Sequence, residues 1–130
     1  MTVEPLLIPG KYGPEVEIIL YRGDCIELLE SIPAGSAQFA VTSPPCNIGK
    51  PYEKTRHPLT GYLADQAKVI SQCAEILKPG GSICWEIGNH VHEGEVYPLD
   101  TFSHLIFKGL SLHLRNRVVW HYEHGLHSSR

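Results

Sequence analysis

Residues 42–50 read TSPPCNIGK, and they follow a short apolar run, AQFAV, at residues 37–41. The apolar run is typical of a buried strand, and the two prolines, Pro44 and Pro45, predict where it ends. Each proline fixes its own φ and holds the preceding residue in an extended conformation. Because neither proline has an N–H group, the segment offers carbonyl oxygens and the Ser43 hydroxyl as hydrogen-bond acceptors. The stretch therefore predicts a rigid, acceptor-rich corner at the carboxyl end of a strand, which is where open α/β sheets bind their ligands.

Strands and helices are predicted to alternate on both sides of this corner. Before it, residues 16–21 predict a strand, and residues 25–31 predict a short amphipathic helix with Asp24 as its N-cap. The predicted segments after it are a helix over residues 61–77, a strand over 82–87, a helix over 98–109 and a final strand over 112–122. His90 and His92 are expected in a surface loop. The alternation predicts an α/β fold with a mixed, mostly parallel sheet and helices on its faces.

The composition is that of an ordinary globular protein. Of the 130 residues, 42% are hydrophobic and 19% are charged, and the formal net charge of -3 leaves room for a local basic groove. No apolar run is long enough to span a bilayer, no signal peptide is visible, and the four cysteines are scattered. We therefore expect a cytoplasmic protein without a membrane partner. An irregular arm over residues 1–14 is expected to precede one domain over residues 15–130.

The acceptor-rich corner suits the activation of an exocyclic amino group. Such a group on a nucleobase is a poor nucleophile, because its lone pair is delocalised into the ring. The Ser43 hydroxyl and the Pro44 carbonyl could accept hydrogen bonds from its two N–H groups and so favour a tetrahedral nitrogen. A base in duplex DNA would have to leave the stack to reach the corner.

Three further segments accompany residues 42–50 in a fixed order, namely YRGDC at 21–25, LKPGGS at 77–82 and RVVWH at 117–121. Together they resemble the motifs of site-specific DNA amino-methyltransferases, which methylate cytosine N4 or adenine N6. In that family the catalytic motif is written (D/N/S)-P-P-(Y/F/W), and an acidic residue in the segment before it helps to hold the adenosine of the cofactor. The order of the segments resembles the β class, in which the catalytic part comes first.

The resemblance implies a fold, a cofactor, a partner and a set of site residues. The fold is a partial Rossmann-like methyltransferase fold, the cofactor is S-adenosylmethionine, and the partner is double-stranded DNA in a restriction–modification system. Catalytic roles are implied for Ser43, Pro44, Pro45 and Cys46, cofactor contacts for Asp24, Cys25 and Thr42, and DNA contacts for Asn47, Lys50, Trp120 and His121.

Two residues of the corner bear on the target base. Cys46 stands where the family has an aromatic residue that stacks on the flipped base, so weaker holding of the target is expected. A Pro-Pro-Cys sequence also resembles the cytosine-C5 methyltransferases, but the Asn-Ile-Gly-Lys continuation belongs to the amino-methylating family. Ser43 in place of Asp favours cytosine N4 by family association, with adenine N6 as the alternative.

Two parts of the family pattern are not found in the sequence. These are the target-recognition segment and the Phe-x-Gly-x-Gly cofactor motif, which in the β class come later than the catalytic part. The glycines at 10–13 and 80–81 do not form a strand–Gly-x-Gly–helix cradle. We therefore expect a truncated or split form, in which a second chain could carry the cofactor-binding half. An inactive remnant or an interaction module is the alternative. The histidines that follow His121 at intervals of three do not predict a metal site, because a strand would not bring them together.

Overall fold

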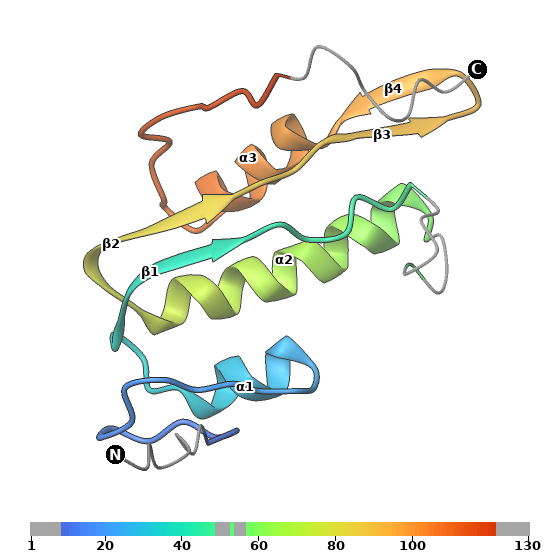
Figure 1. Ribbon diagram of the computed structural model, residues 1–130. Helices are drawn as coiled ribbons and strands as arrows, with labels where there is room; N and C mark the ends of the chain where they lie inside the picture. Colours follow the sequence, from blue (N-terminus) through green and yellow to red (C-terminus); the bar gives the residue numbers. More distant parts are fainter. Residues whose placement is uncertain (1–8, 49–52, 54–56, 122–130) are drawn as a thin grey trace.

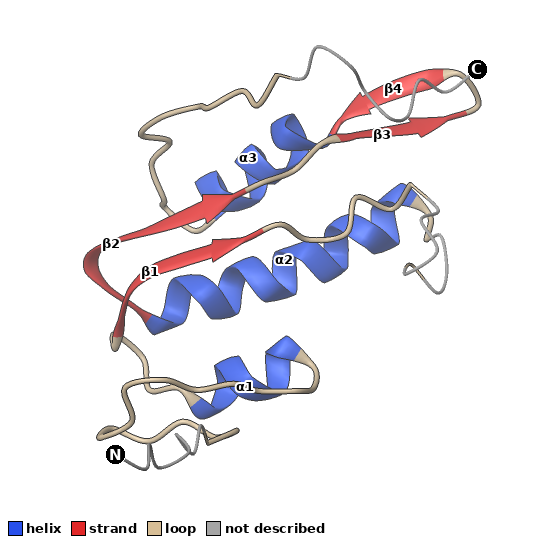
Figure 2. Ribbon diagram, in the orientation of Figure 1, coloured by secondary structure: helices blue, strands red, loops and turns tan. Residues whose placement is uncertain are grey.

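The computed structural model describes residues 9–48, 53 and 57–121. Figure 1 shows three helices and four strands along these residues. In chain order they are α1 (Cys25–Ser31), β1 (Ala37–Thr42), α2 (Leu59–Ile76), β2 (Leu77–Trp85), β3 (Asn89–His92), β4 (Glu95–Pro98) and α3 (Leu99–Gly109). The predicted α/β fold is confirmed, since a parallel strand pair is combined with helices (Figure 2). None of the helices in the described residues is long and apolar enough to cross a membrane.

The central unit is the strand pair β1–β2, which is parallel and is connected through α2. Parallel neighbours need such a crossover, because the chain has to return to the same end of the sheet before it can pair again. The register places Ala40 opposite Ile83 and Thr42 opposite Trp85. The carboxyl ends of both strands therefore lie at the same end of the molecule, which is where the proline-rich stretch begins.

The pairing of β1 with the first half of β2 is irregular. The register shifts between Ala37 and Phe39, and Gly80 takes a positive φ of 78°. A β carbon on Gly81 would lie 2.9 Å from the carbonyl oxygen of Lys78 and 3.1 Å from that of Gln38. A side chain there would collide with backbone atoms, so the close approach of the two strands requires glycine at this position.

Helix α2 provides most of the core. Its buried residues recur every three or four positions, as expected for one face of a helix, and they are Tyr62, Gln66, Ile70, Cys73 and Ile76. The helix contacts α1, α3 and β2. Ile70 on α2 and Leu99 on α3 are the largest fully buried side chains. The 18-residue α2 is thus the rigid element against which the other parts are placed.

The predicted helix over residues 25–31 is confirmed together with its cap. The Asp24 carboxylate accepts a hydrogen bond of 2.8 Å from the backbone N–H of Ile26, which would otherwise lack a partner in the first turn. The helices predicted over 61–77 and 98–109 are confirmed as α2 and α3, with ends one or two residues away from the expected positions.

The two outer predicted strands are wrong, since neither residues 16–21 nor the described residues 112–121 form a strand. Both segments have the β-branched composition of strands, yet Leu20 and Val118 are 72% and 85% exposed. A strand needs a neighbour that accepts and donates its backbone hydrogen bonds. In residues 16–21 the Leu20 N–H donates to the carbonyl oxygen of Pro9 at 3.1 Å, but no ladder of such bonds forms there or in the described residues 112–121, so neither segment is a strand.

The hairpin β3–β4 was not predicted. Its turn has positive φ at Glu93 and Gly94, 51° and 81°, which is the pattern that matches the twist of a two-residue hairpin. His90 on β3 is only 4% exposed, and its ring lies 5.9 Å from that of Tyr97 on β4. The expectation of a surface loop is therefore wrong, because both histidines belong to β3. His90 and His92 lie on the same face of the strand, with their rings stacked at 6.3 Å, but only His90 is buried, whereas His92 next to the turn is exposed.

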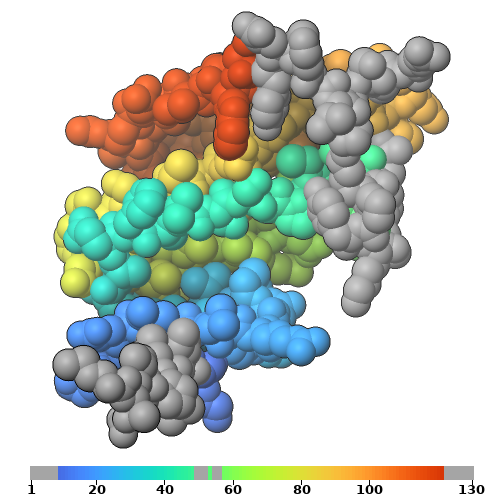
Figure 3. All heavy atoms as spheres, in the orientation of Figure 1, coloured from blue at the N-terminus to red at the C-terminus, as the bar shows by residue number. Residues whose placement is uncertain are grey.

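The face of the β1–β2 pair that carries Phe39 and Val41 is open in the described residues. These side chains are 57% and 68% exposed, and their partners in register, Ser82 and Cys84, are exposed as well. Figure 3 shows the turquoise atoms of β1 lying uncovered on the side in view. Among the described strands β1 pairs with β2 alone, so its other edge carries no strand.

Candidate active site

The proline corner, defined as residues 43–46, begins directly where the sheet ends. The last bond between the strands is donated by the N–H of Glu86 to the carbonyl oxygen of Thr42 at 2.9 Å. Beyond it Ser43 and Pro45 are exposed, whereas Pro44 and Cys46 are half-buried. The Ser43 hydroxyl is therefore accessible to a ligand at the carboxyl end of β1, as the sequence predicts for a binding edge.

Tyr62 contacts the corner from the inner side. Its hydroxyl donates a hydrogen bond of 2.8 Å to the carbonyl oxygen of Pro45, and the residue is 5% exposed. Burial raises the pKa of Tyr62 above its ordinary value, and electrostatic interactions with the nearby Cys46 and Glu53 raise it further. Tyr62 therefore remains a neutral hydrogen-bond donor throughout the physiological pH range.

Cys46 lies against two neighbours at the bottom of the corner. Its Sγ atom is 3.8 Å from the carbonyl oxygen of Pro44, which is a weak thiol hydrogen bond. A β carbon on Gly88, in the loop after β2, would lie 3.7 Å from the same sulfur atom. Cys46 thus fills the space between the corner and the loop that follows β2, and its thiol contacts the carbonyl oxygen expected to accept from a target amino group.

Asn47, predicted to contact DNA, has a different contact in the structure. It is 3% exposed, and its side-chain amide forms two hydrogen bonds with the backbone of His57. The amide donates to the carbonyl oxygen of His57 at 2.7 Å and accepts from its N–H at 2.9 Å. Asn47 has a φ of 57°, a left-handed conformation that asparagine tolerates better than most residues. A contact of Asn47 with DNA stays a prediction, whereas its bond to the chain is observed. Lys50 lies outside the described residues.

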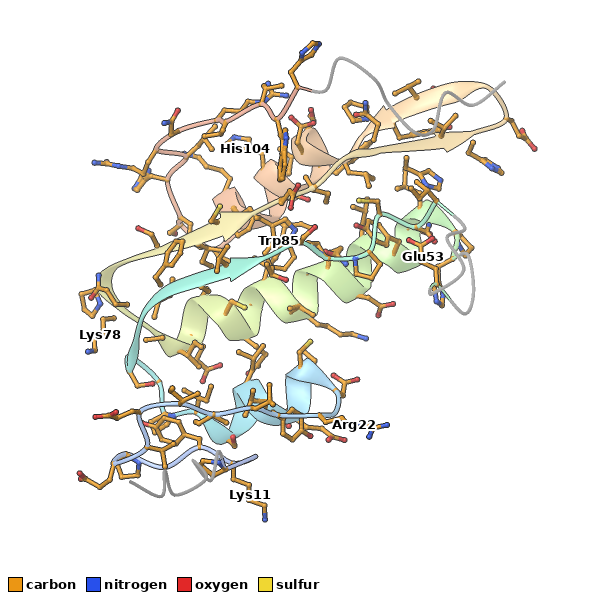
Figure 4. The ribbon with its side chains drawn as sticks, viewed as in Figure 1. Lys11, Arg22, Glu53, Lys78, Trp85 and His104 are labelled. Atoms are coloured by element: carbon orange, nitrogen blue, oxygen red, sulfur yellow. The ribbon has the colours of Figure 1, made fainter. Side chains whose placement is uncertain are left out.

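The residues expected at the cofactor lie toward the same end of the molecule as the corner. Figure 1 shows the N-terminal end of α1 and the carboxyl end of β1 facing the same side. In Figure 4, Arg22 and Glu53 mark this end, and Lys78 marks the opposite one. Asp24 and Cys25 are exposed and Thr42 is half-buried. The exposed carboxylate of Asp24 fits the hydroxyl groups of an adenosine, which need an acceptor, although one of its oxygens also caps α1.

Trp120 and His121 lie in the extended segment after α3. Both are exposed, Trp120 by 71%, so Trp120 does not lie in the core. The segment is attached to α3 through Arg117, whose guanidinium pairs with the Asp100 carboxylate in the first turn of that helix. The roles of Trp120 and His121 at a target base stay predictions.

Sequence reasoning missed Tyr62, which touches the corner directly, and Trp85, which closes the end of the sheet. Trp85 lies opposite Thr42 and meets the ring of Phe107 on α3 edge-on at 5.9 Å. No short motif marks either residue. The signal that could have found Tyr62 is its place in the first turn of the helix that follows the corner.

Comparison with known proteins places these features in a family. The family profile described as DNA methylase, N6_N4_Mtase, matches residues 37–130. The Type II methyltransferase M.BglII of Bacillus subtilis is 41% identical over 127 residues, which cover 97% of this chain and 35% of that protein. The Type II methyltransferase M.BamHI of Bacillus amyloliquefaciens is 37% identical over 67 residues, covering 49% of this chain and 16% of that protein.

The similarity extends to a protein from another genus but covers only part of each relative. The Type II methyltransferase M.ScaI of Streptomyces caespitosus is 29% identical over 121 residues, which cover 92% of this chain and 38% of that protein. This chain thus spans little more than a third of M.BglII and of M.ScaI. Since the family profile matches more than half of the chain and includes the proline corner, the chain belongs to the N6/N4 family of DNA methylases.

Proposed function

We propose that this chain is the catalytic portion of a Type II DNA methyltransferase that methylates the N4 amino group of cytosine. The observation that carries the proposal is the position of two acceptors at the carboxyl end of β1, the hydroxyl of the exposed Ser43 and the carbonyl oxygen of the half-buried Pro44. The names of the relatives support a Type II methyltransferase of a restriction–modification system, and the description of the family supports DNA, which we take to be double-stranded, as the substrate. The family as a whole supports S-adenosylmethionine as the methyl donor.

The proposed chemistry needs little more than correctly placed acceptors. Ser43 and Pro44 accept hydrogen bonds from the two N–H groups of the flipped base, which localises the lone pair on nitrogen. The nitrogen forms a bond to the methyl carbon of the donor, the bond from that carbon to sulfur breaks, and its electron pair stays on sulfur. The nitrogen then carries a positive charge and loses one proton to solvent water. Fixed acceptors are effective because they need not reorient during the reaction.

The choice of cytosine over adenine rests on Ser43. The Ser-Pro-Pro form of the motif is commonest among enzymes that methylate cytosine N4, and the N6 group of adenine is the alternative target. Cys46 in place of an aromatic residue removes a stacking surface that is worth about 1–3 kcal/mol per base in single-strand binders. We therefore expect the target base to be held less tightly than in relatives with an aromatic residue.

We further propose that a second polypeptide segment supplies the cofactor-binding half and covers the open face of β1. The exposed side chains of Phe39 and Val41, with the unpaired edge of β1, are the surface that such a segment would cover. In this arrangement residues 15–130 form the catalytic portion, and Asp24, Cys25 and Thr42 lie on its side of the cofactor.

Transfer of labelled methyl groups tests the proposal. Double-stranded DNA is incubated with labelled S-adenosylmethionine and this chain, alone or mixed with the part of M.BglII that the chain does not cover. Nucleoside analysis is expected to show labelled N4-methylcytosine, at least in the mixture. Labelled N6-methyladenine would instead assign adenine as the target. Transfer in neither condition would overturn the enzymatic proposal and favour an interaction module.

A matched pair of serine variants tests the acceptor. Ser43→Ala is expected to lower the rate of transfer about a hundredfold, as for removal of one preorganised polar group. Ser71→Ala, which changes an exposed serine on α2, is expected to keep the full rate. Equal rates for the two variants would exclude Ser43 as an acceptor in the reaction.

A further inference from the structure

The proline corner is held at both ends while its middle stays exposed. On one side, the bond from the Glu86 N–H to the Thr42 carbonyl ties it to the sheet. On the other side, Tyr62 and Asn47 tie it to the start of α2. Between these ties lie the Ser43 hydroxyl and the Pro44 carbonyl. We propose that Tyr62 and Asn47 are positioning residues that aim these two acceptors at the target amino group, an inference that rests on the proposed function.

Tyr62 is well placed for this role because its own position is fixed. It lies in the first turn of α2, where its N–H donates to the carbonyl oxygen of Pro58 at 3.0 Å. Its ring is buried, and its single hydroxyl proton is directed at the carbonyl oxygen of Pro45 over 2.8 Å. Proline has no N–H, so this carbonyl is the one main-chain group of Pro45 that can be anchored by a hydrogen bond.

Asn47 supplies the second anchor, directly after the corner. Its amide pairs with the N–H and the carbonyl oxygen of the same residue, His57, as two neighbouring strands would pair. These two hydrogen bonds between side chain and backbone join the two ends of the segment between residues 47 and 57. It also brings the end of the corner to within two residues of Leu59, where α2 begins.

Tyr62 therefore connects the corner directly to the N-terminal end of α2, and Asn47 connects it to His57, just before that helix. This helix also carries the buried residues Ile70, Cys73 and Ile76, so its position is set by the core. A peptide held by the sheet at one end and by such a helix at the other has little freedom in its middle, although Ser43 itself is bonded to neither Tyr62 nor Asn47. Displacements of about 1 Å at a catalytic group can lower a rate by about a hundredfold. Loss of an anchor should therefore be measurable as a lower rate of methyl transfer.

The test compares two tyrosine variants in the full chain, mixed with the part of M.BglII that it does not cover. Tyr62→Phe removes only the hydroxyl that bonds to Pro45 and keeps the buried ring. Tyr97→Phe is the matched control, because its hydroxyl donates to the exposed carboxylate of Glu95 on the hairpin. We expect Tyr62→Phe to lower kcat about tenfold with KM for DNA within about twofold of the wild type, and Tyr97→Phe to change neither.

A spectroscopic readout accompanies the kinetics. With ¹³C at the carbonyl groups of proline, the chemical shifts of Pro44 and Pro45 are expected to change in Tyr62→Phe and to stay constant in Tyr97→Phe. A third variant, Asn47→Gly, keeps the left-handed backbone available and removes both bonds to His57, and it is expected to lower kcat in the same way. An excess of DNA or of S-adenosylmethionine is not expected to restore the lost activity.

The outcomes separate this inference from the proposed function. Unchanged kcat in both Tyr62→Phe and Asn47→Gly would overturn the positioning role, even if the carbonyl shifts change. A rise in KM with constant kcat would overturn it too, because the two residues would then serve binding. If the wild type transfers no methyl group, the proposed function fails. The carbonyl shift of Pro44 then decides the positioning role by itself, and no change on loss of the Tyr62 hydroxyl would overturn it.

Discussion

The proline corner and the extended segment over residues 112–121 differ in what holds them. The corner has irregular backbone, yet Tyr62 on α2 binds it through one hydrogen bond, and Asn47 directly after it forms two more with the backbone of His57, two residues before α2. The extended segment has the composition of a strand, but Val118, Val119 and Trp120 are 85%, 78% and 71% exposed. Order in this protein thus follows from contacts with the core, and strand propensity alone does not produce a strand.

The largest effect on stability is expected from a substitution in the buried face of α2, the helix that holds the corner. Ile70 is fully buried on α2, and Ile70→Ala should lower the free energy of unfolding by about 2–5 kcal/mol, because it leaves a cavity in the core. Urea unfolding followed by circular dichroism measures the change. Leu105→Ala on α3, at a position that is 64% exposed, is the control and should change stability by less than about 0.5 kcal/mol.

Removal of the Asn47 anchor should have the next largest effect. Asn47→Ala is expected to lower the free energy of unfolding by about 2–3 kcal/mol, since two hydrogen bonds are lost and alanine is unfavourable at a φ of 57°. Asn47→Gly loses the same bonds without the conformational cost and should therefore be the more stable of the two variants. Equal stability of both variants in urea unfolding would show that backbone conformation plays no part.

The raised pKa of Tyr62 predicts a loss of stability in alkaline solution. In the folded state this pKa lies above its ordinary value of 10.0, so above about pH 10 the unfolded state releases the proton first. Stability is therefore complete below pH 10 and falls as the pH rises above it, by at most about 1.4 kcal/mol per pH unit. Urea unfolding between pH 8 and 11 should show this slope in the wild type and a smaller one in Tyr62→Phe. The same slope in both proteins would assign the effect to other tyrosines.

The smallest effect is expected in the extended segment. Val119→Thr keeps the shape of the side chain, and because Val119 is exposed we expect a change below about 0.5 kcal/mol in the free energy of unfolding of this chain. A larger loss in the isolated chain would show that the segment is packed after all and would weaken the contrast with the corner. Thermal unfolding with and without the complementary part of M.BglII measures the effect in both settings.

The parts of the fold that were predictable from the sequence are those with local signals. Asp24 before residues 25–31 marked the start of α1, and the prolines after residue 42 marked the end of β1. The broad apolar face of residues 61–77 marked α2. The hairpin β3–β4 lacked the Asn-Gly or Asp-Gly signal of such turns and was missed, although its Glu93-Gly94 turn takes positive φ at both positions.

The two outer strands were predicted wrongly for the opposite reason. Residues 16–21 and 112–122 carry a clear strand pattern, but pairing depends on a neighbour that the pattern does not specify. Likewise the catalytic motif was readable at Ser43-Pro44-Pro45-Cys46, whereas the role of Asn47 as an anchor was not. Its partner is the backbone of His57. Because nearly all residue types carry the same backbone groups, the sequence does not mark such a partner.

The sequence by itself determined the α/β class, the end of β1 and the acceptors at the corner, because prolines and caps act on their immediate neighbours. It also carried the family, through motifs that keep their order along the chain. The tertiary structure decided which strands form and what fixes the corner. Tyr62 reaches Pro45 across 17 positions of the chain, and only the packing of α2 beside the sheet brings the two together.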